Sequence, residues 1–181
     1  MQTLYTDISE QLAEKFAKIK LLVCDIDGVF SDGKIYMGND GEELKTFNTK
    51  DGFGVKALIA SGVPVAVITG RTSNIVQTRM TSLNITDIVQ GTEDKLPALT
   101  SILEKYQVAP EQVAYIGDDM PDLVCIEHVG LGVAVGDAHP LVKAGADYIT
   151  SINGGSGCVR EVCDTIMQLQ GTLAAARGAS V

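Results

Sequence analysis

Acidic side chains in this sequence gather directly after short apolar segments. Asp25 and Asp27 follow the apolar residues 21–24, and Asp118 follows the apolar residues 113–116. Alternate side chains of an extended chain point to the same side, so the first two carboxylates leave their segment together. Three close carboxylates repel one another and favour a bound cation. Oxygen ligands select a hard ion, so the pattern predicts a site for Mg²⁺ before Ca²⁺ at Asp25, Asp27 and Asp118.

Two further polar groups accompany these acids. Thr69-Gly70-Arg71 follows the apolar residues 64–68, and Lys95 stands further along the chain. A D-x-D-G sequence alone is compatible with a turn, and a G-D-D sequence with a helix N-cap. Their joint placement after apolar segments, together with Thr69 and Lys95, favours one reactive site.

The elements that must position these residues are visible as an alternation of apolar runs and helical patterns. Strands are expected at residues 21–24, 64–68, 87–89, 113–116, 131–135 and 148–149. Helices are expected at about residues 4–18, 52–61, 73–83, 95–106, 119–128, 141–144 and 159–170. This alternation predicts one α/β domain over residues 1–181, with a doubly wound, mostly parallel, Rossmann-like sheet. The polar groups would then meet at the carboxyl ends of its strands, where such sheets bind ligands.

One segment, residues 29–50, interrupts the alternation. Residues 34–37 and 43–47 flank the turn-forming Asn39-Asp40-Gly41 and predict a β-hairpin after the first strand. Its apolar residues would be poorly covered in a single chain, so we expect hairpins to pack together in an oligomer; these residues are Ile35, Tyr36, Met37, Leu44 and Phe47. At the other end, residues 171–181 are small and polar, and we expect them to fray.

Composition excludes several classes of protein. The 181 residues are 45% hydrophobic with few aromatic side chains, which fits a folded domain with an aliphatic core. The net charge of −9 argues against nucleic acid or an anionic membrane as partner. The sequence shows neither a signal peptide nor an apolar run of about 20 residues. Its four cysteines lack metal-ligand spacing, so reduced thiols and a cytoplasmic location are expected.

The polar groups together resemble the four motifs of the haloacid dehalogenase-like phosphohydrolase superfamily. The matching residues are Asp25-Ile26-Asp27-Gly28-Val29, Thr69-Gly70-Arg71, Lys95 and Gly117-Asp118-Asp119, in the family's order along the whole chain. The resemblance implies that Asp25 is a nucleophile that forms an aspartyl-phosphate and that Asp27 is the general acid and base. Thr69 and Lys95 would bind the phosphoryl oxygens.

The same resemblance implies a ligand set for the cation. Asp25, the carbonyl of Asp27 and Asp118 would hold Mg²⁺. Asp119 and Asp122 would stand behind them and orient Lys95 or the water molecules of the ion.

The intervals between motifs are too short for the cap domain that usually covers this site. Residues 27–33, 47–54 and 154–161 are similar to the signatures of the small capless sugar-acid phosphatases, with mild departures at Phe30-Ser31 and Cys158. This similarity implies a phosphorylated sugar acid as substrate, in lipopolysaccharide precursor synthesis. It also implies a homotetramer in which C-terminal segments close a neighbouring subunit's site, and we expect these segments to be the glycine-rich loop 154–157 and the residues after 170.

A substrate with a phosphate and a carboxylate needs at least two cationic anchors. Thr69 and Lys95 suit the phosphate, whereas Lys56, Arg71 and Arg79 suit the carboxylate and hydroxyl groups. The full set of expected substrate-binding residues is Asp27, Asn48, Thr49, Lys50, Asp51, Gly52, Lys56, Arg71, Arg79 and Lys95. Eight-carbon acids phosphorylated at position 8 and nine-carbon acids phosphorylated at position 9 both remain open.

Other functions of the same sheet stay open at this stage. A phospho-accepting signalling module also combines acids, Mg²⁺, a Thr and a Lys, but usually has two adjacent acids after its first strand and its phosphorylated Asp after the third. A phosphotransferase or mutase is a further alternative. Residues 52–57 spell a G-x-G-x-x-A sequence, but they follow polar residues rather than a buried strand, so a dinucleotide site is not expected.

Overall fold

A six-stranded, wholly parallel sheet organises the chain, of which the computed structural model describes residues 1–176. The strand order is β5-β4-β1-β6-β7-β8. The strands are β1 (Leu21–Cys24), β4 (Val65–Thr69), β5 (Asp87–Gln90), β6 (Val113–Gly117), β7 (Leu131–Ala134) and β8 (Tyr148–Ile149). The predicted fold class is confirmed, and each predicted strand lies within one residue of an observed one.

Seven α-helices surround this sheet in the part of the chain described. They are α1 (Glu10–Ala17), α2 (Thr49–Ala60), α3 (Asn74–Ser82), α4 (Lys95–Tyr106), α5 (Met120–His128), α6 (Pro140–Gly145) and α7 (Cys158–Leu169). Two helices begin elsewhere than predicted. The Ser9 side chain caps α1, so this helix starts six residues later. Asn48 caps α2 by accepting from the Lys50 N–H, so that helix starts three residues earlier.

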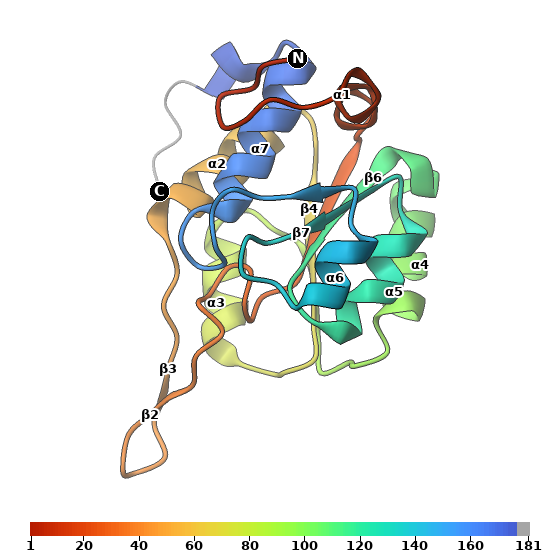
Figure 1. Ribbon diagram of the computed structural model, residues 1–181. Coiled ribbons are helices and arrows are strands. Elements are labelled where there is room, and N and C mark those ends of the chain that lie inside the picture. The colour runs from red at the N-terminus through yellow and green to blue at the C-terminus, as the bar shows by residue number, and fades with distance from the viewer. Residues whose placement is uncertain (177–181) are drawn as a thin grey trace.

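The helices form a layer on each side of the sheet (Figure 1). Helix α7 packs on α2 and α1 on one side, whereas α5 packs between α4 and α6 on the other. From β1 the chain runs outward through β4 and β5, then returns to β6 on the opposite side of β1. This reversal places the carboxyl ends of β4, β1 and β6 side by side, and such a switch point is where open α/β sheets bind ligands.

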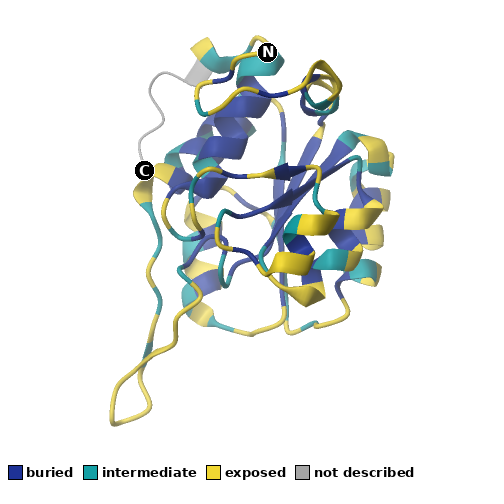
Figure 2. Ribbon diagram, in the orientation of Figure 1, coloured by how far each residue is buried: buried dark blue, intermediate teal, exposed yellow. Residues whose placement is uncertain are grey.

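The inserted hairpin projects away from the body of the molecule (Figure 2). Its strands, β2 (Tyr36–Met37) and β3 (Glu43–Leu44), are antiparallel and shorter than predicted. The apolar side chains of Ile35, Met37 and Leu44 are exposed, as expected. Phe47 differs from expectation because it packs against the core of its own chain.

The chain after α7 departs from the expected frayed end. A short 3-10 helix, Leu173–Ala176, follows α7, and Leu173 packs against the core. The segment is therefore anchored on its own subunit up to this point, because a leucine and a backbone hydrogen bond from Thr172 to Met167 fix it. Residues 177–181, which belong to the predicted mobile tail, lie outside the described residues.

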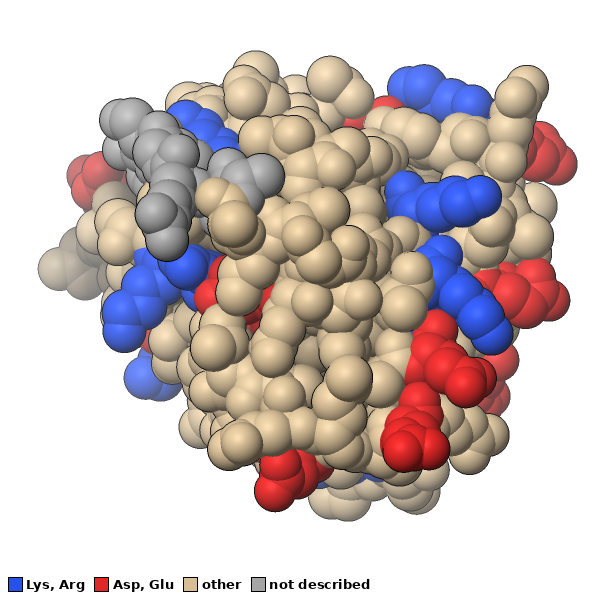
Figure 3. Space-filling view, turned by 90° about the horizontal axis from the view of Figure 1, so that it is seen from above, with Lys and Arg blue, Asp and Glu red and all other residues tan. Residues whose placement is uncertain are grey.

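No helix in residues 1–176 is long and apolar enough to cross a bilayer. On the face drawn in Figure 3, lysines and arginines stand beside acidic side chains around a broad area without charge. The charged side chains described on that face form no continuous basic surface.

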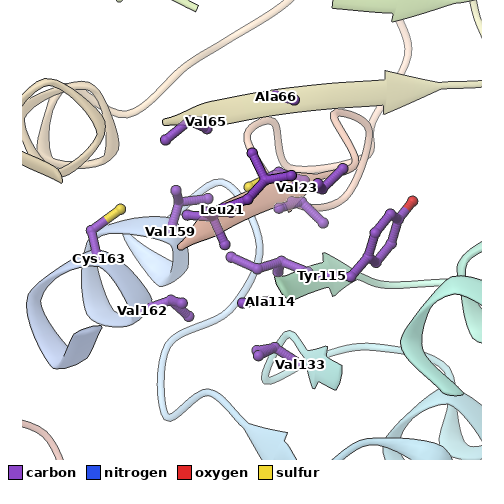
Figure 4. Close-up of a cluster of buried hydrophobic side chains, with 14 of the residues drawn as sticks. Leu21, Val23, Val65, Ala66, Ala114, Tyr115, Val133, Val159, Val162 and Cys163 are labelled. Carbon is purple, nitrogen blue, oxygen red and sulfur yellow. The ribbon is translucent and has the colours of Figure 1, made fainter. Parts of the chain in front are cut away.

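The core between α7 and the sheet is aliphatic, as the composition predicts. Val159, Val162 and Cys163 lie on the side of α7 that faces Leu21 of β1 (Figure 4), and all four are fully buried. Burial of such side chains supplies most of the favourable free energy of folding. The packing holds the strand ends, and the acids that follow them, in fixed positions.

Candidate active site

A tight turn after β1 sets the positions of Asp25 and Asp27. The Ile26 carbonyl accepts hydrogen bonds from the N–H groups of Val29, Phe30 and Ser31, at 3.2, 2.9 and 3.0 Å. Asp25 remains tied to the sheet through its N–H, which donates to the Ile116 carbonyl at 2.9 Å. Asp25 is therefore almost buried at the end of β1, whereas Asp27 is half-buried at the start of the turn.

Asp118 reaches the same place from β6 because Gly28 has no side chain. A Cβ on Gly28 would stand 2.1 Å from Asp118 Oδ2, and the residue has a φ of +87°, which favours glycine. The glycine of the D-x-D-G sequence therefore makes room for the carboxylate of the third acidic motif.

A buried ammonium lies between two of the acids. Lys95 begins α4, and its Nζ lies 2.6 Å from Asp122 Oδ1 and 2.9 Å from Asp25 Oδ1. Burial lowers the pKa of Lys95, but attraction to Asp25 and Asp122 outweighs this effect and leaves the pKa above its ordinary value. Lys95 is therefore a fixed positive charge at the bottom of the site.

Asp122 is occupied by donors from its own chain. Besides Lys95, it accepts from the Tyr115 hydroxyl at 2.8 Å and from the N–H groups of Asp118 and Asp119 at 3.1 and 3.3 Å. Asp119 in turn caps α5 by accepting from the Met120 N–H. Asp122 thus contacts Lys95, whereas the Asp119 carboxylate bonds the start of α5. The predicted place of both residues behind the ligands of the ion stays a prediction.

Three acids of the site are close enough together to hold a cation. Oxygen atoms of Asp25, Asp118 and Asp122 lie within 4.8 Å of one another. Burial and repulsion from Asp122 raise the pKa of Asp25 to about 7, and burial and repulsion from Asp25 raise the pKa of Asp118 to about 8. Asp25 Oδ1 is buried and has no well-directed hydrogen bond among the described residues. Because Asp122 is held by donors, Asp25 and Asp118 are the carboxylates best placed to bind a divalent ion.

These groups border a cavity of about 340 Å³. Of the residues singled out from the sequence, the structure brings together around it Asp25, Asp27, Thr69, Arg71, Lys95, Asp118, Asp119 and Asp122. Thr69 is buried at the end of β4, and Arg71 is exposed at the edge of the cavity. One cavity therefore combines a carboxylate cluster with two positive side chains. Since the acids outnumber the bases, a bound cation is needed before the cavity suits an anion.

Other expected substrate-binding residues do not line this cavity in the single chain. They are Asn48, Thr49, Lys50, Asp51, Gly52, Lys56 and Arg79. Asn48 to Gly52 form the cap and first turn of α2, and Lys56 lies further along that helix. Arg79 of α3 borders a separate hollow of about 480 Å³ next to Phe47.

Asp51 is buried and accepts a hydrogen bond from a neighbouring helix. Its carboxylate is 1% exposed and accepts a hydrogen bond from the backbone N–H of Arg160 at 2.8 Å, at the start of α7. Burial raises the pKa of Asp51 to about 6, against the effect of the hydrogen bonds from α7. The residue thus stabilises the start of a neighbouring helix.

The glycine-rich loop 154–157 packs on the turn after β1 of its own chain. Its approach to a neighbouring subunit's site stays a prediction. The Gly155 N–H donates to the Val29 carbonyl at 2.8 Å, and a Cβ on Gly154 would stand 1.8 Å from the Gly28 carbonyl oxygen. The loop therefore supports the turn that carries Asp27, because only a residue without a side chain fits so close to that turn.

Sequence reasoning missed two hairpin residues at the edge of the site. Lys45 donates to Asp27 Oδ1, and Glu43 accepts from Arg71 Nη2 at 2.9 Å. The only signal in the sequence is that Glu43, Lys45 and Phe47 alternate, which places them on one side of the hairpin strand.

The sheet, the order of the acidic motifs and the cavity define a class of hydrolase. The family model for haloacid dehalogenase-like hydrolases matches residues 68–162. The chain belongs to this family.

Several proteins similar to this chain are phosphatases of one sugar acid. The chain is 50% identical, over its full length and 96% of the relative's, to 3-deoxy-D-manno-octulosonate 8-phosphate phosphatase KdsC of Escherichia coli K12. The crystal structure of the phosphatase of that name from Yersinia pestis covers 100% of this chain and 98% of its own, with a TM-score of 0.97 and 50% identity. The Moraxella catarrhalis phosphatase, solved with a magnesium ion, a phosphate ion and a KDO molecule, is 41% identical, with a TM-score of 0.90 over 93% of this chain and 97% of its own.

Proposed function

We propose that this chain is a Mg²⁺-dependent phosphatase that converts 3-deoxy-D-manno-octulosonate 8-phosphate to the free sugar acid and phosphate. The observation that carries the proposal is the cluster of buried Asp25, half-buried Asp118 and buried Lys95 in the cavity at the switch point of the sheet. The full-length similarity to phosphatases of that substrate supports the choice of sugar acid.

Asp25 is the proposed nucleophile. Its carboxylate attacks phosphorus, a bond from its oxygen to phosphorus forms, and the bond between phosphorus and the sugar oxygen breaks. Lys95 and Thr69 hold the phosphoryl oxygens, so that the charge of the transferred group is balanced. Asp25, Asp118 and the carbonyl of Asp27 are the residues that would hold Mg²⁺, which supplies further positive charge next to the phosphoryl group when bound.

Asp27 is the proposed acid and base. In the first step its carboxyl group gives a proton to the leaving sugar oxygen, and in the second its carboxylate takes a proton from the water that attacks the aspartyl-phosphate. Asp122 holds Lys95 in place for both steps through the 2.6 Å ion pair. A hydrolytic second step distinguishes this enzyme from a signalling module or a mutase.

The carboxylate of the sugar acid needs a cation outside the phosphate position. Arg71 is the cation at the mouth of the cavity, held by Glu43 of the hairpin. Several expected substrate-binding residues lie outside this cavity, namely Lys56, Arg79 and the residues from Asn48 to Gly52. For these residues we propose that they bind substrate in the site of a neighbouring subunit.

A homotetramer is the proposed assembly, with hairpins packed together. The exposed apolar side chains of Ile35, Met37 and Leu44 support it, since such hairpin edges usually find a partner. A cytoplasmic location is proposed as well, supported by four cysteines that are buried and free. Closure of a neighbour's site by the end of the chain is tested by deleting residues 177–181, which keeps the core contact of Leu173.

The experiment is a phosphate-release screen. Purified protein is given Mg²⁺ and phosphorylated eight- and nine-carbon sugar acids, with small aryl and alkyl phosphates for comparison. Steady, catalytic release that is fastest with the octulosonate 8-phosphate supports the proposal. Faster release from a nine-carbon 9-phosphate would reassign the substrate, and a single stoichiometric phosphorylation without turnover would indicate a signalling module.

A further inference from the structure

One lysine of the hairpin, Lys45, contacts a residue of the active site. Lys45 follows β3, and its side chain is only 3% exposed although the hairpin around it is open to solvent. A buried ammonium needs a partner, because removal of a charge from water is costly. The partner is Asp27, whose Oδ1 accepts a hydrogen bond from Lys45 Nζ.

This contact leaves one oxygen of Asp27 for chemistry. Both side-chain contacts of the Asp27 carboxylate go to Oδ1, from Lys45 and from the Ser31 hydroxyl at 3.5 Å. Among the described residues, Oδ2 is therefore the oxygen available to exchange a proton with a substrate in the cavity that Asp27 lines.

Lys45 also belongs to a row of alternating charges. Its Nζ lies 3.9 Å from Glu43 Oε1, and the same oxygen accepts from Arg71 at 2.9 Å. Opposite charges therefore follow one another from Asp27 through Lys45 and Glu43 to Arg71, which also lines the cavity. Such a network fixes side chains that would each be mobile alone.

We infer that Lys45 is a positioning residue that holds the Asp27 carboxylate in the orientation for proton transfer to the leaving group. The inference rests on the proposed function, since it assigns a positioning residue to Asp27, the proposed general acid. Because a displacement of about 1 Å can reduce a rate on the order of 10²-fold, loss of the contact should slow the step that needs the proton.

The test compares leaving groups. An alkoxide leaves only with a proton, whereas 4-nitrophenolate is a stable anion and leaves without one. With Mg²⁺ present, Lys45→Met should lower kcat/KM on the order of 10²-fold for the octulosonate 8-phosphate and for an alkyl phosphate without a carboxylate. The kcat/KM for 4-nitrophenyl phosphate should fall far less, because this parameter reports the steps up to departure of the leaving group.

Two controls separate positioning from structure. Lys34, an exposed lysine on the same hairpin, is outside the cavity, so Lys34→Met should leave all three substrates unchanged. In an Asp27→Asn background, Lys45→Met should cause no further loss with the alkyl phosphate. Lys45→Gln keeps an N–H donor and should restore part of the rate, and it replaces Lys45→Met if that variant does not fold.

Each result is decisive. Equal losses on all three substrates would show a structural role and overturn the inference while the phosphatase assignment stands. Loss on the sugar acid alone would make Lys45 a carboxylate anchor and would also overturn it. If the wild type releases phosphate from none of the substrates, the proposed function fails and the inference fails with it.

Discussion

The carboxylate of Asp51 on α2 accepts a hydrogen bond from the backbone N–H of Arg160 on α7 at 2.8 Å. Helix α7 begins after Gly157, a residue without a capping side chain, so the first turn of α7 obtains its acceptor from another helix. Two of the three segments similar to the sugar-acid phosphatases, residues 47–54 and 154–161, therefore meet one another. Their shared role is to join α2 to α7 beneath the turn of Asp27.

Asp51→Ala should destabilise the protein more than it changes binding. Loss of the acceptor leaves buried N–H donors unpaired, at a cost of about 1–3 kcal/mol. The melting temperature should fall by several degrees with KM for the sugar acid unchanged, in thermal unfolding and steady-state assays of the same sample. A higher KM with an unchanged melting temperature would show that Asp51 acts in substrate binding rather than in stability.

Much of the fold could be predicted from the sequence, because apolar runs and the turn-forming residues between them are local signals. The continuous apolar runs at residues 21–24 and 113–116 predict buried parallel strands, and both strands are found. The order of Asp25, Thr69, Lys95 and Asp118 along the chain predicts a shared edge, because parallel strands bring their carboxyl ends together. These residues do line one cavity.

The sequence was a poorer guide where a role depends on a distant contact. The resemblance of residues 47–54 to the sugar-acid phosphatases made Asp51 a candidate substrate-binding residue, whereas its hydrogen-bond partner in this structure lies on a helix more than a hundred residues away. Lys45 had no role assigned from the sequence, and only the three-dimensional path of the hairpin places it against Asp27. The glycines at 154 and 155 indicate a close approach of the backbone to a site, and in the single chain that approach is to the turn after β1.

Metal binding should reverse an unfavourable effect of pH on stability. The pKa of Asp118 is about 8 in the folded chain, against an ordinary value of 3.8, chiefly because of burial and then the charge of Asp25. In the metal-free protein the folded state therefore keeps a proton that the unfolded chain loses, and stability should fall as pH rises from about 4 to about 8.

Melting temperatures with chelator and with Mg²⁺ across this pH range test that prediction. Mg²⁺ should stabilise more at high pH, where the carboxyl groups are ionised. Asp118→Asn should flatten the pH dependence in chelator and lose most of the Mg²⁺ effect. A variant that keeps both the slope and the Mg²⁺ response would exclude Asp118 from the ion site.

Arg71→Ala should discriminate between substrates. A hydrogen bond to a charged group contributes about 1.5–3 kcal/mol, so kcat/KM for the carboxylated sugar phosphate should fall roughly 10- to 100-fold. The value for 4-nitrophenyl phosphate should change little, since that substrate has no carboxylate. Equal losses on both would mean that Arg71 serves the phosphoryl group or the fold.

Charges on the exposed apolar side chains of the hairpin should break the proposed tetramer. Met37 and Leu44 are 71% and 58% exposed in the single chain, so Met37→Lys with Leu44→Lys should not disturb the monomer's own core. Sedimentation should show smaller particles than wild type, with secondary structure retained. Sedimentation of the wild type as a monomer at micromolar concentration would contradict the proposed tetramer.

The nucleophile is tested most directly by trapping the phosphorylated enzyme. Asp27→Asn keeps the nucleophile but cannot activate water, so with Mg²⁺ and 4-nitrophenyl phosphate labelled with ³²P it should accumulate label that hydroxylamine releases. Peptide mapping should place the label on Asp25, and adding Asp25→Asn should abolish both the label and turnover. Label on any other residue, or phosphate release by Asp25→Asn at the wild-type rate, would contradict the mechanism.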